Sequence, residues 1–262
     1  MNSPALLPGR STPSNRHLPV SLLTGSLQDF GKPVRDVLDL GPQPSLREKQ
    51  LQADELPMID PADSPVEGFA YTVLKRTFDL VSAILGVVIL SPVLVAIALL
   101  VRLSAPGPIL FRQERVGRHG KHFTLLKFRT MYCSSAAESD TIWTTKNDSR
   151  CTPLGSMLRK FCLDELPQLL NVIRGEMSLV GPRPERPHFV AKFRANIQKY
   201  NMRHGCQVGI TGWAQVHGLR GDTSIPNRLQ YDLHYMQNWS FALDLRIIVR
   251  TMFTALQDEN GY

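Results

Sequence analysis

Cysteine is scarce in this sequence and shows no recognisable arrangement. The 262 residues contain four cysteines, at positions 133, 151, 162 and 206, without a CxxC pair and without the Cys/His spacing of a metal site. A small disulfide-bonded domain and a structural zinc site both require such spacing, so the sequence argues against both. Reduced thiols in a cytoplasmic domain fit this pattern best.

Several signatures of other protein classes are absent as well. Residues 1–10 contain two prolines and no sustained apolar run, so a secretory signal peptide is not expected. The net charge of +7 favours an anionic partner, but it does not choose among nucleic acid, a phosphate-bearing substrate and an anionic membrane. Because no helix-turn-helix, zinc-finger or RNA-binding signature accompanies the charge, nucleic acid is not expected as a partner.

Changes of composition divide the chain into three parts. Residues 1–68 are rich in Pro, Ser, Gly and charge and hold no long apolar period, which is typical of a flexible tail. Residues 69–106 contain one long apolar run, and residues 107–262 mix polar and apolar segments as a globular domain does. We therefore expect a tail, a membrane anchor and a cytoplasmic domain, in that order.

The apolar run extends from Leu80 to Val101 and holds 22 residues without a charge. At about 1.5 Å per residue, a straight helix of this length reaches roughly 33 Å, enough to cross the hydrocarbon layer. Ser91 and Pro92 lie near its middle, where proline removes a backbone donor and bends the helix. The Ser91 hydroxyl could satisfy a carbonyl that the proline leaves without a donor.

Basic residues flank both ends of this run. Lys75 and Arg76 precede it, and it is followed by Arg102, Arg112, Arg115 and Arg118. Because basic flanks favour the cytoplasmic side, both ends are expected there. A re-entrant hairpin that turns back at Ser91-Pro92 meets this expectation, and a kinked helix that spans the membrane is the alternative.

The remaining segments predict a small mixed domain. Short strands are expected over residues 109–115 and 122–128, joined by a loop over 117–120. Helical patterns follow over residues 154–161, 164–174, 187–200, 226–237 and 241–256. The last helix could lie in the membrane interface as an amphipathic helix or pack on the domain core. The predicted fold class is therefore mixed α/β, mainly helical, with a re-entrant membrane helix hairpin and amphipathic interfacial helices.

Asp164 and Glu165 are the central candidates for chemistry. They precede Pro167, which is tolerated only near a helix start, so both acids are expected at a helix N-terminus. Two adjacent carboxylates there can bind Mg²⁺, and one of them can attack phosphorus to give an acyl phosphate. Simple capping of the helix is the alternative.

Cationic side chains surround this pair in the sequence. Arg159 lies five residues before Asp164, and Lys127 and Arg129 end a probable strand, so several donors could converge on a diphosphate. A solvated surface or contact with anionic lipid is the alternative, and it suits Arg112, Arg115 and Arg118 better. A stiff loop, Gly181-Pro182-Arg183-Pro184-Glu185, presents Arg183 and Glu185 for phosphate or nucleotide binding, unless it is only a connector.

Taken in order, these segments resemble the bacterial sugar transferase family. Its members are the monotopic polyprenyl-phosphate phosphoglycosyl transferases that begin exopolysaccharide, capsule and O-antigen synthesis. The resemblance covers nearly everything after residue 70 and rests on these segments: Lys75 to Asp79, Ser91-Pro92, Lys127 to Met131, Leu163 to Gln168, Gly181 to Glu185, Gly209 to Val216 and Asp244-Leu245.

The resemblance implies a phosphotransferase reaction at the cytoplasmic face of a bacterial inner membrane. Asp164 would form a phosphosugar–aspartyl intermediate, with Glu165 assisting at a Mg²⁺ site, and UMP would leave before undecaprenyl phosphate attacks. Lys127, Arg129, Arg159, Arg183 and Glu185 would bind substrate, and Ser91-Pro92 would turn the membrane helix back. The segment Gly218 to Thr223 resembles members that use UDP-glucose, with UDP-galactose as the close competitor.

One departure from the family pattern stands beside these expectations. Members commonly carry a basic residue and a proline before Gly209, where this chain has Gln207-Val208, so the neighbouring loop could handle its ligand differently. A scaffold that kept the fold and lost turnover is a competing hypothesis, against which the intact Asp164, Glu165 and Arg159 argue. A homo-oligomer is left open.

Overall fold

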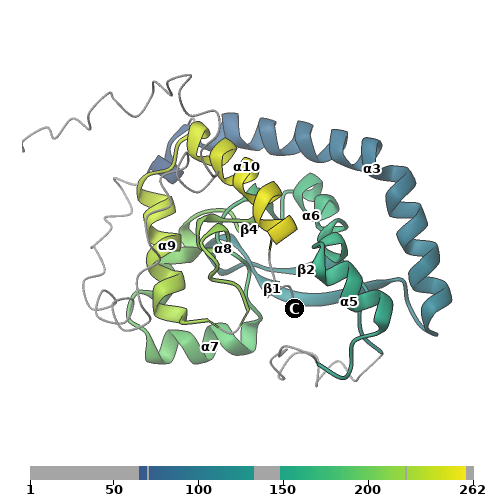
Figure 1. The fold of residues 1–262 in the computed structure, drawn as a ribbon. Coiled ribbons are helices and arrows are strands. Elements are labelled where there is room, and N and C mark those ends of the chain that lie inside the picture. Colours follow the sequence, from purple (N-terminus) through teal and green to yellow (C-terminus); the bar gives the residue numbers. More distant parts are fainter. Residues whose placement is uncertain (1–64, 70, 133–147, 222, 258–262) are drawn as a thin grey trace, which may run out of the picture. The chain divides into compact units, whose positions relative to one another are not determined.

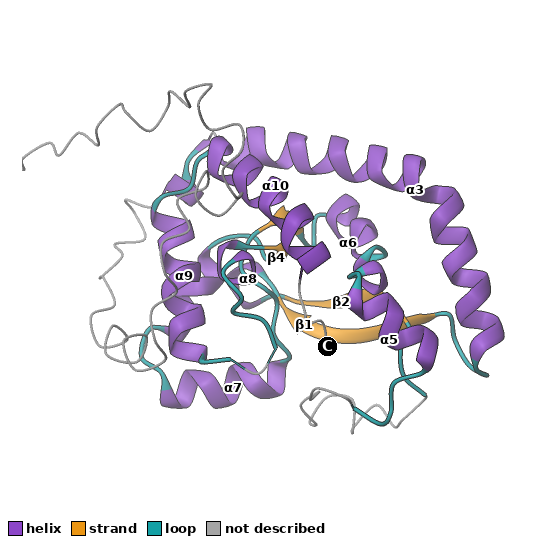
Figure 2. Cartoon of the chain, in the orientation of Figure 1, coloured by secondary structure: helices purple, strands orange, loops and turns teal. Residues whose placement is uncertain are grey.

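The computed structural model describes residues 65–69, 71–132, 148–221 and 223–257. These residues all fall within the unit Leu46–Tyr262 and form mostly helices, with two short two-stranded sheets (Figure 2). The mixed, mainly helical fold class predicted from the sequence is therefore confirmed. Apart from residues 65–68, the predicted tail lies outside the described residues.

The apolar run forms one long bent helix. A π-helical turn, η6 (Tyr71–Lys75), leads into α3 (Arg76–Ser104), which has 29 residues and contains Pro92. Figure 1 shows that α3 bends part of the way along. The Ser91 hydroxyl donates to the carbonyl of Val88 at 2.8 Å, the carbonyl that the amide of residue 92 would reach if it were not proline. The predicted compensation by Ser91 is confirmed, and with it the helix bends without a break.

Most of α3 exposes apolar side chains. The segment Tyr71–Ser104 is long and apolar enough to cross a membrane, and only 11% of its most apolar window is buried. A core helix of a soluble protein would be mostly buried. The exposed side chains include Val88, Ile89, Val95, Leu99 and Leu103. This surface indicates membrane association.

Both ends of α3 are fastened to the rest of the unit by charged side chains. Near the first end, Lys75 Nζ lies 2.7 Å from Asp244 Oδ2, and both side chains are almost fully buried. At the last turn, the Arg129 guanidinium donates to the carbonyls of Val101 and Ala105 at 3.1 and 2.6 Å. These ties hold the helix against one body at its beginning and at its end.

Two pairs of short strands complete the scaffold. The two predicted strands are present as β1 (Leu110–Val116) and β2 (His122–Phe128), and they pair antiparallel over their full length. Strands β3 (Ser178–Val180) and β4 (Gly209–Thr211) pair parallel, and the sequence patterns did not predict them. The second pair brings the Gly181 loop beside the segment that follows Gln207.

The predicted helices are all present, with shifted ends. The helices and helical turns are η5 (Pro65–Glu67), η7 (Arg118–Gly120), α5 (Pro153–Lys160), η8 (Leu163–Glu165), α6 (Gln168–Arg174), α7 (Pro187–Asn196), η9 (Tyr200–Gly205), α8 (Trp213–Val216), α9 (Ile225–Gln237) and α10 (Phe241–Gln257). The expected helix over 164–174 is divided into η8 and α6, because Pro167 cannot donate the backbone hydrogen bond that would join them.

Helix α10 has two different faces: it packs on the domain core, as one interpretation predicted, and its place in the membrane interface stays a prediction. Asp244, Ile247 and Arg250 are buried against the domain, whereas its exposed side chains include Val249 and Met252. The helix starts beside α3, where the rings of Phe241 and Phe78 meet edge to face at 5.0 Å. Its exposed apolar face therefore adds to the one that α3 presents.

A core cluster joins α3 to the turn that carries the candidate nucleophile. Ile97 and Val101 of α3 pack with Phe128 and Leu158, and Leu163 and Leu166 pack against the same cluster. Burying side chains of this size contributes about 1.5–3 kcal/mol each. The acidic turn is thus fixed directly to the second half of the apolar helix.

Candidate active site

The two acids lie in the one-turn helix η8, between α5 and α6. Cys162, just before it, adopts a left-handed conformation with φ 54°, which reverses the chain after α5. Glu165 N–H donates back to the Cys162 carbonyl at 3.2 Å and closes the turn. Pro167 then starts α6 without an amide to satisfy. The acids therefore lie at the N-terminal side of a helix, as predicted, but in a separate turn that precedes it.

Asp164 and Glu165 have opposite surroundings. Lys127 Nζ lies 2.7 Å from Glu165 Oε1, and Arg183 Nη2 donates to the same oxygen at 2.5 Å. Asp164 is buried but accepts no hydrogen bond from the described residues, and the same Lys127 Nζ lies 3.8 Å from its Oδ2. Glu165 is held by cations, and Asp164 keeps its lone pairs available.

This difference appears in the proton affinities of the pair. Burial raises the pKa of Asp164, Lys127 lowers it, and the neighbouring Glu165 carboxylate raises it again, with a net increase. Burial also acts to raise the pKa of Glu165, but Arg183 and Lys127 outweigh it and hold that pKa well below its usual range. These surroundings favour the charged form of Glu165, and Asp164 is the more basic of the two carboxylates.

Arg159 approaches the pair from α5. Its Nε donates to the Thr130 hydroxyl at 2.8 Å, which directs the side chain, and its charge is close enough to lower the pKa of Asp164. Gly155 allows this packing, because a Cβ there would lie 2.0 Å from the Thr130 carbonyl oxygen. Lys127, Arg159 and Arg183, from three separate segments, thus gather around the two acids as predicted.

Arg220 was not among the predicted site residues, yet it reaches the same turn. Its Nη1 lies 3.6 Å from Cys162 Sγ, two residues before the nucleophile candidate. Burial raises the pKa of the Cys162 thiol, Glu165 raises it further, and Arg220 lowers it. The Arg220 guanidinium is therefore close enough to the acidic turn to interact with it electrostatically. The resemblance of residues 218–223 to UDP-glucose users was the sequence signal that pointed to this segment.

Two predicted substrate ligands are placed elsewhere. The Arg129 side chain is buried, and besides Val101 and Ala105 it donates to the Pro106 carbonyl at 2.5 Å. Glu185 is buried between Arg228, at 2.7 Å, and Arg115, at 3.8 Å. These contacts give no support to a direct role in substrate binding.

Arginines around Glu185 instead hold the loop that carries Arg183 in place. Arg115 donates to the Pro184 carbonyl at 3.0 Å, and Arg203 donates to the Arg183 carbonyl at 2.9 Å. The half-buried Arg115 is thus engaged within the protein, which does not fit the predicted contact with lipid. Arg183 is presented to Glu165 from a braced loop.

Gly181 allows the backbone of its loop to pass close to the backbone at Gln207. A Cβ on Gly181 would lie 2.1 Å from the Gln207 carbonyl oxygen, so two chain segments cross where only glycine fits. Val208 is buried in the core, and Gln207 Nε2 donates to the Gly175 carbonyl at 2.8 Å. At the departure from the family pattern, Val208 thus packs in the core and the half-buried Gln207 binds a backbone carbonyl.

A divalent cation would meet two adjacent carboxylates here, of which Glu165 already binds Lys127 and Arg183. Among the described residues, no group of three or more His, Cys, Asp or Glu side chains could hold a metal alone. Mg²⁺ is usually bound by one or two carboxylates together with water and substrate phosphates. The Asp164 carboxylate, which accepts no hydrogen bond from the described residues, lies beside Glu165 and fits that kind of site.

Comparison with known proteins agrees with the motifs. The model of the family described as bacterial sugar transferase matches residues 70–258. The UDP-glucose:undecaprenyl-phosphate glucose-1-phosphate transferase of Escherichia coli (strain K12) is 42% identical over 213 residues, which are 79% of this chain and 45% of that protein. The protein of the same name from Caulobacter vibrioides is 40% identical over 248 residues, 93% of this chain and 86% of the relative.

A third relative is similar in length to the matched region. The exopolysaccharide production protein PSS of Rhizobium leguminosarum bv. phaseoli is 41% identical over 197 residues, 72% of this chain and 98% of that protein. The chain spans about half the length of several other curated relatives that it matches, from 45% to 48%. Since the family model covers most of the sequence and the acidic turn has the geometry described above, the chain belongs to the bacterial sugar transferase family.

Proposed function

We propose that this protein transfers a hexose 1-phosphate from a UDP-sugar to undecaprenyl phosphate and releases UMP, the first membrane step of exopolysaccharide or capsule synthesis. The observation that carries this proposal is the unequal carboxylate pair. Asp164 is buried, accepts no hydrogen bond from the described residues and lies 3.8 Å from Lys127 Nζ, whereas Glu165 is held at short range by Lys127 and Arg183. A buried carboxylate with free lone pairs is suited to attack an electrophile.

The proposed reaction has two displacements at one phosphorus. An Asp164 oxygen attacks the phosphorus next to the sugar, and the bond to the bridging oxygen breaks, so UMP leaves with the electron pair. An oxygen of undecaprenyl phosphate then attacks the acyl phosphate, the Asp164–phosphorus bond breaks, and the carboxylate is restored. Lys127, Arg159, Arg183 and Arg220 stabilise charge on the transferring oxygens.

We further propose that Asp164 and Glu165 hold Mg²⁺ when substrate is bound. When bound, the ion would neutralise charge on the diphosphate. Independently of the ion, Arg183 and Lys127 keep Glu165 ionised, and burial keeps Asp164 away from bulk water. The ion and the cationic side chains would share the task of binding the diphosphate.

Glucose is the sugar that we propose. Relatives that match most of this chain carry UDP-glucose in their names. Arg220 extends from the segment that resembles UDP-glucose users and contacts the acidic turn through Cys162. Galactose remains the competing hexose, since one hydrogen bond to an epimeric hydroxyl can decide between them.

We propose a monotopic, re-entrant arrangement in the bacterial inner membrane, with the domain on the cytoplasmic side. Support comes from the two ends of α3, because Lys75 binds Asp244 while Arg129 binds the last turn of the helix. A helix fastened to one domain at both ends is better suited to enter and leave a membrane on the same face than to span it. The bend of α3, which contains Pro92, allows this course (Figure 1).

The reaction is tested with purified protein, Mg²⁺, UDP-glucose and undecaprenyl phosphate. We expect UMP release, and we expect Asp164→Asn to abolish it while the protein still fractionates with membranes. Glu114→Gln is the matched control, because Glu114 is an exposed acid at the far end of β1. Full activity of Asp164→Asn would remove this residue from its proposed role.

Topology is tested by labelling single cysteines in a variant whose four native cysteines are replaced by serine. The exposed positions Thr77 and Leu103 lie near the two ends of α3. A re-entrant helix leaves both inaccessible to a membrane-impermeant maleimide added from the periplasm and both reactive after lysis. Labelling of one position alone from the periplasm would show a spanning helix.

A further inference from the structure

A cavity of about 610 Å³ lies apart from the acidic turn, around the closed end of the β1–β2 hairpin. Its lining comes from this end, from η5, α7, η9 and α9, and none of it comes from α3, α6 or α10. His122 lines the cavity, and Lys127 lies five residues further along β2, so the two Cα atoms are roughly 17 Å apart. The cavity is therefore separate from the candidate active site and from the exposed apolar helices.

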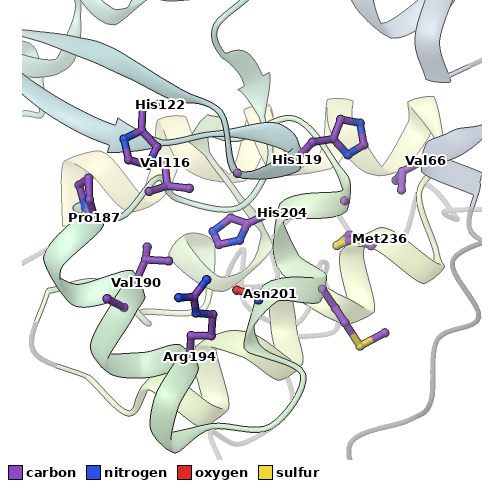
Figure 3. A pocket seen from close by; sticks show the side chains of 14 residues that line it. Val66, Val116, His119, His122, Pro187, Val190, Arg194, Asn201, His204 and Met236 are labelled. Atoms are coloured by element: carbon purple, nitrogen blue, oxygen red, sulfur yellow. The ribbon is translucent and has the colours of Figure 1, made fainter.

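The inner wall of this cavity carries one unsatisfied polar group. His204 is only 7% exposed, and its Nε2 has no hydrogen-bond partner among the described residues. Figure 3 shows its ring at the centre of the cavity, between Val116 and Asn201. Burial, helped by Arg203, lowers the pKa of His204 to about 4, so the imidazole is neutral at pH 7. Since an unpaired buried polar atom costs free energy, this nitrogen favours a ligand that supplies a partner.

The surroundings of His204 change from apolar to cationic. Val116, Val190 and Met236 are buried and line the cavity with it, whereas Arg194 is exposed and turns its guanidinium toward the cavity (Figure 3). None of the lining residues that the structure describes is acidic, although Glu114 pairs with His122 nearby at 2.9 Å. The apolar walls can pack against a flat heterocyclic ring, and the neutral imidazole of His204 can hydrogen-bond to the polar edge of that ring. The exposed guanidinium of Arg194 can bind an anionic group.

We propose that this cavity binds a soluble nucleotide, with the base against His204 and the phosphate at Arg194. A nucleotide has this order of groups: a neutral heterocycle at one end and an anion at the other. An acyl chain would leave the His204 nitrogen unpaired, and inorganic phosphate would leave the apolar walls empty. The inference does not depend on the proposed transfer reaction.

The test is binding of AMP, GMP and UMP to the purified full chain in detergent, measured by titration calorimetry. We expect saturable binding of at least one of them. His204→Phe keeps an aromatic ring but removes the hydrogen bond, and Arg194→Ala removes the outer cation, so each should weaken binding at least tenfold. Lys192→Ala is the matched control, because Lys192 is an exposed cation on the same helix that does not line the cavity.

A third variant protects the test against misfolding. Ala191 is exposed on α7 and lines the cavity, so Ala191→Trp fills the space without entering the core. It should abolish binding and leave the unfolding temperature unchanged. Failure of all three nucleotides to bind, or binding that survives both Ala191→Trp and His204→Phe, would overturn the proposal. Binding lost in Arg183→Ala but not in His204→Phe would place the nucleotide at the acidic turn and would also overturn it.

Discussion

Replacing Arg129 by methionine distinguishes a structural role from a substrate-binding role. The guanidinium is buried and donates to the carbonyls of Val101, Ala105 and Pro106. Methionine keeps much of the volume but leaves these three acceptors without the donor. At about 1.5 kcal/mol for each bond to a charged group, the unfolding free energy should fall by about 4–5 kcal/mol. For a protein of this size that corresponds to a fall of roughly 10–15 °C in Tm.

The assay is thermal unfolding of the purified variant in detergent, together with KM for UDP-glucose. Arg112→Met is the matched control, since Arg112 is exposed on β1 and should change stability by less than about 0.5 kcal/mol. A structural Arg129 predicts a large loss of stability, with KM unchanged in the fraction that remains folded. Unchanged Tm with a strongly raised KM would refute this interpretation and restore the substrate contact predicted from the sequence.

Three further changes follow from contacts described above. The pKa of Glu165 is held below its ordinary 4.5, so its ion pairs stabilise the fold above pH 4.5 and this stabilisation is lost as the pH falls through the lowered pKa. In Glu165→Gln the unfolding free energy should therefore decrease less steeply with falling pH, measured by denaturant unfolding at a series of acidic pH values. Gly155→Ala places a methyl against the Thr130 carbonyl and should cost about 3 kcal/mol or more in a denaturant titration. Ser91→Ala leaves the Val88 carbonyl unpaired and should cost about 1 kcal/mol, measured by unfolding in detergent.

The sequence predicted those parts of the structure that depend on local chemistry. Proline at position 92 leaves a known carbonyl unpaired, and the serine beside it is close enough to compensate. The acids at 164 and 165 lie before a helix because Pro167 can only begin one. Motif order also identified Lys127 and Arg183 as neighbours of the acids, although 38 and 18 residues separate them from Glu165.

Other contacts could not be predicted, because the two partners are distant in the chain and no sequence motif or periodicity links them. Arg129 donates to carbonyls at a helix end, and any residue type supplies a carbonyl. Glu185 binds Arg228, 43 residues away, and a charge by itself does not show whether its partner is protein or substrate. The pairing of β3 with β4 involves three residues on each strand, too few for a periodic signal.

Mass spectrometry of the enzyme incubated with UDP-glucose and without acceptor tests the central claim most directly. An Asp164 nucleophile predicts that the peptide containing this residue gains the mass of a hexose phosphate, and that undecaprenyl phosphate removes it again. The release of UMP should match the amount of adduct formed. Turnover with acceptor present, while no adduct ever forms at Asp164 in its absence, would contradict the covalent mechanism.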